Sequence, residues 1–220
     1  MFQGFASFGA DTLHSSSPET DDLFVAKYSA GGTLRWVQQG GGQGIDIPSS
    51  LAIDAAGDIV VTGSFGGRTG DTAVFGDTVL TSVSGSDVFV VKYTTAGRVR
   101  WARRAGDRRR DLATGLAVDE AVYVGVDYDD ERIAVPDDSV RTPADKQGAF
   151  VVKYDAQGQE RWEIPVDHPP GARSRITSLT TDATGTLLVL NTFWEAITFS
   201  PHWSATWMGT GCELMKVATP

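Results

Sequence analysis

The sequence contains very little cysteine, histidine or asparagine, and it has no long run of apolar residues. The single cysteine, Cys212, excludes an internal disulfide and any metal site built from several cysteines. No segment reaches the roughly 18 consecutive apolar residues of a membrane helix, and the amino-terminal residues lack the basic, apolar and small-residue order of a signal peptide. We therefore expect no membrane insertion, and the cellular compartment stays open.

Positive charge is scarce as well. The chain has 19 lysine and arginine residues against 28 acidic ones, which gives a formal net charge of −9. This balance repels nucleic acid and anionic lipid, so we expect no nucleic-acid partner. Glycine, with 25 residues, is abundant, and 41% of the residues are hydrophobic. Together with the many valines, threonines and aromatic residues, this composition predicts an all-β protein with a substantial core.

One short segment recurs four times along the chain. Phe24–Tyr28 reads FVAKY, Phe89–Tyr93 and Phe150–Tyr154 both read FVVKY, and Leu214–Val217 is a degraded copy. The lysines of these copies are 65, 61 and 63 residues apart. In the first three copies a glycine-containing turn follows, and a tryptophan stands nine residues after the lysine. These tryptophans, which we interpret as packing residues between neighbouring sheets, are Trp36, Trp101 and Trp162.

A second hairpin follows each tryptophan, and an aspartate marks its turn. These aspartates are Asp54, Asp119 and Asp182. Each unit of about 60 residues therefore contains four alternating apolar strand segments separated by glycine and aspartate turns. A four-stranded antiparallel sheet repeated at this period predicts a β-propeller-type array of about three and a half blades.

The repeat divides a single domain into five parts. Residues 1–23 are the tail of a split blade, because Phe8-Gly9 echoes the Phe75-Gly76 that closes the first full unit. Two blade repeats follow, then a divergent third repeat, and then the first strand of a further blade. Their ranges are 24–88, 89–149, 150–212 and 213–220.

The order of motifs within the unit resembles a known family. Phe-Val-x-Lys-Tyr, a glycine turn, Trp, Gly-Gly, Ala-Ile-Asp, Val-Thr-Gly-x-Phe and Phe-Gly together are similar to the bacterial SBBP β-propeller repeat. The resemblance covers nearly the whole chain; it is closest across residues 21–93 and weak after residue 165. It implies a propeller fold and a location in the bacterial envelope or outside the cell. It supplies no catalytic residues.

The number of blades is too small for a closed ring. Propellers generally have about four to eight blades, and an open arc leaves blade faces and edges bare. Either the sequence belongs to a longer array, or two copies close one ring of about six to seven blade equivalents. The expected partners are therefore the protein itself or neighbouring blades.

No segment carries a recognisable catalytic or cofactor-binding motif. Gly40–Gly42 leads into a strand pattern, whereas a phosphate-binding loop opens a helix. The three histidines lack a metal-binding spacing, and Cys212 has no histidine placed to activate it. Asp46, Asp111 and the acidic run Asp127–Glu131 offer oxygen ligands that suit calcium, but they lack the spacing of a calcium loop. We expect no catalytic residue, metal or cofactor; calcium is the one cofactor that these carboxylates would suit.

Two unusual clusters are candidate contact surfaces. Seven arginines between Arg98 and Arg110 suit an acidic partner, the Asp127–Glu131 run of another copy, or a hairpin edge kept soluble by charge. An aromatic cluster in the last repeat suits stacking on a sugar, anchoring a protein, or capping the array. The candidate contact residues are Arg103, Arg104, Arg108, Arg109, Arg110, Trp194, His202, Trp203 and Trp207.

The sequence therefore predicts a non-catalytic β-propeller scaffold or interaction module, which completes its ring by self-association or within a longer array. The alternative is a carbohydrate-binding, lectin-like propeller that uses the tryptophan-rich last repeat. In the first case the partner is another copy or another protein, and in the second it is a glycan.

Overall fold

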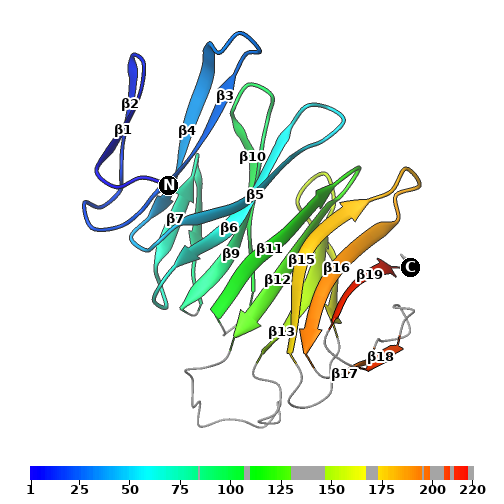
Figure 1. Cartoon of the computed structure of the whole chain (residues 1–220). Helices are drawn as coiled ribbons and strands as arrows, with labels where there is room; N and C mark the ends of the chain where they lie inside the picture. The colour runs from blue at the N-terminus through cyan, green and yellow to red at the C-terminus, as the bar shows by residue number, and fades with distance from the viewer. Residues whose placement is uncertain are drawn as a thin grey trace.

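The computed structural model describes residues 1–83, 85–106, 110–129, 147–166, 173–194, 196–198, 206–208 and 211–217. Every regular element in these ranges is a β-strand, as Figure 1 shows. No helix there is long and apolar enough to cross a membrane. The all-β fold class and the four-stranded antiparallel sheets predicted from the repeats are confirmed.

Four antiparallel sheets contain most of the strands. In spatial order, the first sheet consists of β3 (Leu23–Tyr28), β4 (Leu34–Gly42), β7 (Thr72–Phe75) and β8 (Thr78–Thr81). The second sheet consists of β5 (Ile47–Ile53), β6 (Ile59–Gly66), β9 (Ser86–Tyr93) and β10 (Val99–Ala105). The third consists of β11 (Arg110–Val118), β12 (Val122–Asp129), β13 (Gln147–Tyr154) and β14 (Glu160–Val166). The fourth consists of β15 (Arg173–Thr181), β16 (Leu187–Trp194) and β19 (Gly211–Val217).

Two small hairpins complete the described chain. They are β1 (Phe5–Phe8) with β2 (Asp11–His14), and β17 (Ala196–Thr198) with β18 (Thr206–Met208). The first lies at the amino-terminal end of the array in Figure 1, next to the first sheet. The ring of Phe8 packs edge-on against that of Phe24 in β3, with 4.8 Å between the ring centroids.

The second, third and fourth sheets each take their strands from two successive repeats. The second hairpin of one unit pairs with the first hairpin of the next, in the same register each time. The opposed residues at the lysine position are Val60 with Lys92, Tyr123 with Lys153, and Leu188 with Lys216. The sheets are therefore offset by half a unit from the sequence repeats 24–88 and 89–149, each of which divides its strands between two sheets.

The hairpin β7–β8 follows β6 along the chain, but it joins the first sheet and not the second. β7 pairs with the Gly40–Gly42 end of β4. A Cβ atom on Gly42 would lie 1.6 Å from the carbonyl oxygen of Thr72, so only glycine allows this approach of the two backbones. The close approach of β4 and β7 therefore explains the glycine at position 42.

The sheets follow one another in chain order, from the blue amino-terminal end to the red β19 (Figure 1). The first strands of the second, third and fourth sheets are neighbours, because β11 contacts both β5 and β15. Every residue of the central strand β6 is buried, whereas the edge strand β5 alternates between exposed and half-buried residues. Three apolar clusters fill the three junctions between consecutive sheets. Because the core lies between sheets, each sheet depends on a neighbour for burial.

Candidate functional site

At the first junction, a tryptophan of one sheet packs against a turn of the next. Trp36 on β4 donates its indole N–H to the carbonyl of Thr95, in the turn between β9 and β10, at 3.0 Å. Lys27 Nζ donates to the same carbonyl at 3.1 Å. A Cβ atom on Gly97 would lie 2.7 Å from the Trp36 ring, so a side chain there would push the turn away. The β9–β10 turn therefore closes over the tryptophan and lysine of the preceding sheet.

The second junction repeats this contact. Trp101 on β10 donates its indole N–H to the carbonyl of Ala156, in the turn between β13 and β14, at 3.0 Å. A Cβ atom on Gly158 would lie 2.5 Å from the Trp101 ring. The ring centroids of Trp101 and Tyr154 are 6.2 Å apart, and Tyr154 is 2% exposed. Tyr93, at the equivalent position of β9, is 1% exposed.

The third junction differs from the first two. In the part of the chain that the structure describes, no such turn covers Trp162 on β14. Its ring instead lies 6.0 Å from the ring of Tyr123 in its own sheet. Lys153 Nζ lies over both rings, 5.2 Å from the Tyr123 centroid and 5.9 Å from the Trp162 centroid. At the position of Tyr93 and Tyr154, the strand β19 has valine instead of tyrosine.

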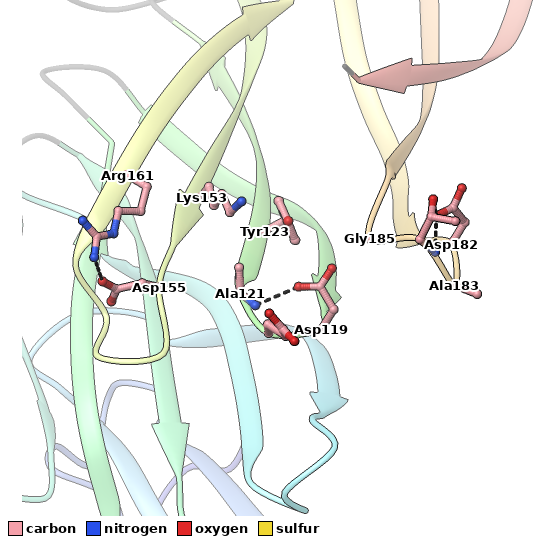
Figure 2. A pocket seen from close by; sticks show the side chains of 11 residues that line it. Asp119, Ala121, Tyr123, Lys153, Asp155, Arg161, Asp182, Ala183 and Gly185 are labelled. Atoms are coloured by element: carbon pink, nitrogen blue, oxygen red, sulfur yellow. Dashed lines mark hydrogen bonds and ion pairs between the residues drawn. The ribbon is translucent and has the colours of Figure 1, made fainter. Parts of the chain in front are cut away.

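A pocket of about 660 Å³ lies at this third junction, as Figure 2 shows. Tyr123, Lys153 and the β11–β12 turn that contains Asp119 form its third-sheet side. The β15–β16 turn, with Asp182 and Gly185, faces them from the fourth sheet. The other two junctions have a β-turn seated on the tryptophan at the corresponding position. Lys153 lines the pocket and lies over the ring of Trp162, so the pocket is next to the tryptophan that lacks a covering turn.

The aspartates of the repeat shape the turns around this region. Asp54 accepts hydrogen bonds from the amides of its own turn and pairs with Lys92 at 2.7 Å. Burial opposes ionisation of Asp54, but Lys92 and the turn amides outweigh it and lower the pKa of the carboxyl. Asp119 and Asp182 also accept hydrogen bonds from amides of their own turns. Lys153 stands at the position of Lys92, and its ammonium lies over the two aromatic rings.

At the other end of the array, β3 is an edge strand. Its equivalents β9 and β13 each pair with strands on both sides, whereas within the described ranges β3 forms a ladder with β4 alone. Its other side has an isolated bridge between Phe2 and Asp22, just before the strand begins. Tyr28 ends β3 at the repeat position of the buried Tyr93 and Tyr154, yet it is 52% exposed.

The turn after β3 has the same exposed character. Gly32 has a φ of 79°, close to the 85° of Gly97 and the 73° of Gly158 in the equivalent turns. Cβ atoms on those two glycines would meet tryptophan rings, but no atom lies within 4 Å of the corresponding position on Gly32. The turn of the β3–β4 hairpin thus has the same conformation as the turns that cover tryptophans, but no tryptophan packs against it within the described ranges.

The arginines on β10 that were predicted as contact residues bond within the chain. Arg103 Nε donates to the carbonyl of Gly158 at 2.6 Å, across the second junction. An Arg104 amino group lies 3.6 Å from the Asp87 carboxylate. Arg110 begins β11 and is exposed. Arg103 therefore links the second and third sheets, and Arg104 pairs with a residue of its own sheet.

The acidic run predicted to meet these arginines begins with a buried residue. Asp127 accepts hydrogen bonds from the Ile176 amide at 3.0 Å and from Arg175 Nε at 2.9 Å, both in the fourth sheet. Burial raises the pKa of Asp127 to about 6, although both of these donors oppose the rise. Asp127 therefore links the third and fourth sheets of one chain.

Other predicted contact residues lie outside the described part. Trp194 ends β16 and Trp207 lies in β18, and their side chains are not among those described. The remaining residues outside it are Arg108, Arg109, His202 and Trp203. The aromatic contact surface and its sugar ligand therefore stay predictions.

Two buried carboxylates meet near the first junction. A Cβ atom on Gly41 would lie 2.7 Å from Asp46 Oδ2 and 3.0 Å from Asp22 Oδ1. Gly42 donates its backbone N–H to Asp46 Oδ2, and Gln39 donates from its side-chain Nε2 to Asp22 Oδ2. Burial raises the pKa of Asp46 to about 7, and the nearby Asp22 adds to the rise. The sequence analysis noted Asp46 as an oxygen ligand but missed Asp22, which only folding brings beside it.

Within the described ranges, no group of three or more His, Cys, Asp or Glu side chains could hold a metal ion. Neither a protein-family model nor a curated protein matches the chain.

The sequence analysis also missed Tyr28 and Gly32. Both residues can be aligned with their equivalents in the other repeats. Their exposure, however, depends on how the sheets assemble, which the repeat pattern does not show.

Proposed function

We propose that this protein is a non-catalytic β-propeller-type scaffold that completes its ring by associating with a second copy. The observation that carries the proposal is the edge position of β3. The two strands that share its sequence motif, β9 and β13, are central strands of complete sheets. An edge strand with unpaired backbone groups is a template for another strand.

The number of sheets fits a closed ring of two copies. Each copy contributes its second and third sheets complete. One further sheet per copy would be shared, with two strands from the fourth sheet of one chain and two from the first sheet of the other. Two copies then make a ring of about six sheets, within the range of closed propellers. A longer array of SBBP-like repeats would supply equivalent strands from the same kind of unit.

The proposal predicts a reversible dimer. Sedimentation velocity at concentrations from about 0.1 to 100 µM should show a species of twice 23.5 kDa that dissociates on dilution. Circular dichroism on the same samples reports whether the dissociated chain keeps its strands. A chain that stays monomeric and cooperatively folded across this whole range would contradict the proposal.

A further inference from the structure

We infer that the β3–β4 hairpin of a second copy docks on the fourth sheet, where it takes the place of β19 beside β16 and seats its turn over Trp162. This inference rests on the proposed function and specifies which surfaces meet. It accounts together for the edge of β3, the exposure of Tyr28 and the pocket at the third junction.

The first argument is that β3–β4 has the same local geometry as the hairpins that already cover tryptophans. The hairpins β3–β4 and β13–β14 share a register shift at the end of the first strand, after Lys27 and Lys153. In the turn after β3, the Ser29 amide donates to the Thr33 carbonyl and the Gly32 amide donates to the Ser29 carbonyl. The β9–β10 and β13–β14 turns have the same pair of hydrogen bonds.

The second argument is that the register fixes which groups meet. β19 pairs with β16 in the register in which β9 pairs with β6 and β13 pairs with β12. If β3 of a second copy occupies this register, its Tyr28 stands where β19 has Val217. Tyr28 then reaches the ring of Trp162, as Tyr154 reaches Trp101 at the second junction.

The turn that follows β3 would then lie over Trp162, next to the pocket. Ala30 of the second copy stands at the position of Thr95 and Ala156, whose carbonyls accept the indole N–H of Trp36 and Trp101. Its carbonyl would accept from Trp162 Nε1 and from Lys153 Nζ, as Thr95 accepts from Trp36 and Lys27. Gly32 would lie flat against the Trp162 ring.

The third argument concerns why the hairpin can displace β19. Within the described ranges, β19 supplies the fourth sheet with a third strand only. The β3–β4 hairpin supplies a third strand, a fourth strand and the turn, and it buries an exposed tyrosine. Additional buried apolar surface and backbone hydrogen bonds favour the exchanged arrangement. The exchange is reciprocal, because each copy has one such hairpin and one such sheet.

Two variants on the docking face test the inference. Tyr28→Ser removes a ring that is half exposed in the single chain, and Gly32→Asn keeps a residue that tolerates positive φ while adding a side chain where the Trp162 ring would lie. We expect each to raise the dimer dissociation constant by about thirty-fold or more, with the thermal unfolding midpoint of the monomer close to that of the wild type.

Matched controls place serine at another exposed hydrophobic residue and asparagine at another glycine of positive φ, both away from this face. Val79→Ser alters a residue of β8 that is 58% exposed, and Gly70→Asn alters a glycine with a φ of 90° that has no atom within 4 Å of its Cβ position. Both should dimerise like the wild type. If the wild type dimerises and all four variants match it, the inference is wrong while the proposed function stands. If the wild type never dimerises, both are wrong.

Discussion

Replacing Trp101 with alanine should lower the free energy of unfolding by about 3–5 kcal/mol. Trp101 is 6% exposed, and its indole N–H reaches the Ala156 carbonyl at 3.0 Å across the second junction. The substitution leaves a large cavity beneath the turn and removes the only donor that the structure shows for that carbonyl within the described ranges. Urea unfolding followed by circular dichroism measures the loss.

Trp162 provides the matched comparison, since it occupies the same repeat position. No turn of the described chain covers it, so Trp162→Ala should cost less than half as much in a monomeric sample. At protein concentrations above the dimer dissociation constant, the two substitutions should lower the free energy of unfolding by similar amounts, because the β3–β4 turn of the second copy then covers Trp162. Equal losses in dilute monomer would show that Trp162 is already fully packed within one chain.

The second large effect is a fall in stability between about pH 5 and pH 8. The folded-state pKa of Asp46 is about 7, above the ordinary value of 3.8, because burial disfavours its charge. The folded state therefore holds a proton that the unfolded chain releases. The stability that this proton contributes is complete below about pH 4 and is lost as the pH rises through 7. Over pH 5 to 8 the loss from Asp46 amounts to about 2–3 kcal/mol.

Asp46→Asn should remove this share of the pH dependence. An asparagine oxygen can still accept the Gly42 amide, and the neutral side chain removes the charge that Asp22 repels. The variant should be more stable than the wild type at pH 8 and similar to it at pH 5, in thermal unfolding at both values. Asp11→Asn makes the same charge change at an exposed position and should leave the slope unchanged. A slope of the Asp46 variant equal to that of the wild type would refute the role of this carboxyl.

The repeat pattern was sufficient to predict the all-β class and the antiparallel sheets, because the strand segments alternate and the turns between them carry a glycine, an aspartate or both. It did not predict that a sheet takes strands from two repeats. That choice depends on which hairpins pair, and pairing is a long-range interaction such as that of Val60 with Lys92. The division of the sequence into units therefore did not reveal the division into sheets.

The candidate site was less accessible from the sequence. The sequence predicts the cluster of arginines to be a contact surface, yet Arg103 and Arg104 bond to groups of their own chain. Tyr28 looked like any other copy of a core tyrosine, since its exposure arises only from the edge position of β3. Nearly identical local sequence can thus be buried or exposed, depending on whether a neighbouring sheet covers it.

Amide hydrogen exchange along β3 and β19 tests the exchanged hairpin most directly. In dilute monomer, alternate amides of β3 should exchange quickly, because they point away from β4, while β19 is protected by β16. In the dimer, every second amide of β3 should gain protection as β19 loses it. Protection of β19 that stays unchanged in a fully dimeric sample, with the outer amides of β3 still exchanging quickly, would contradict the exchange.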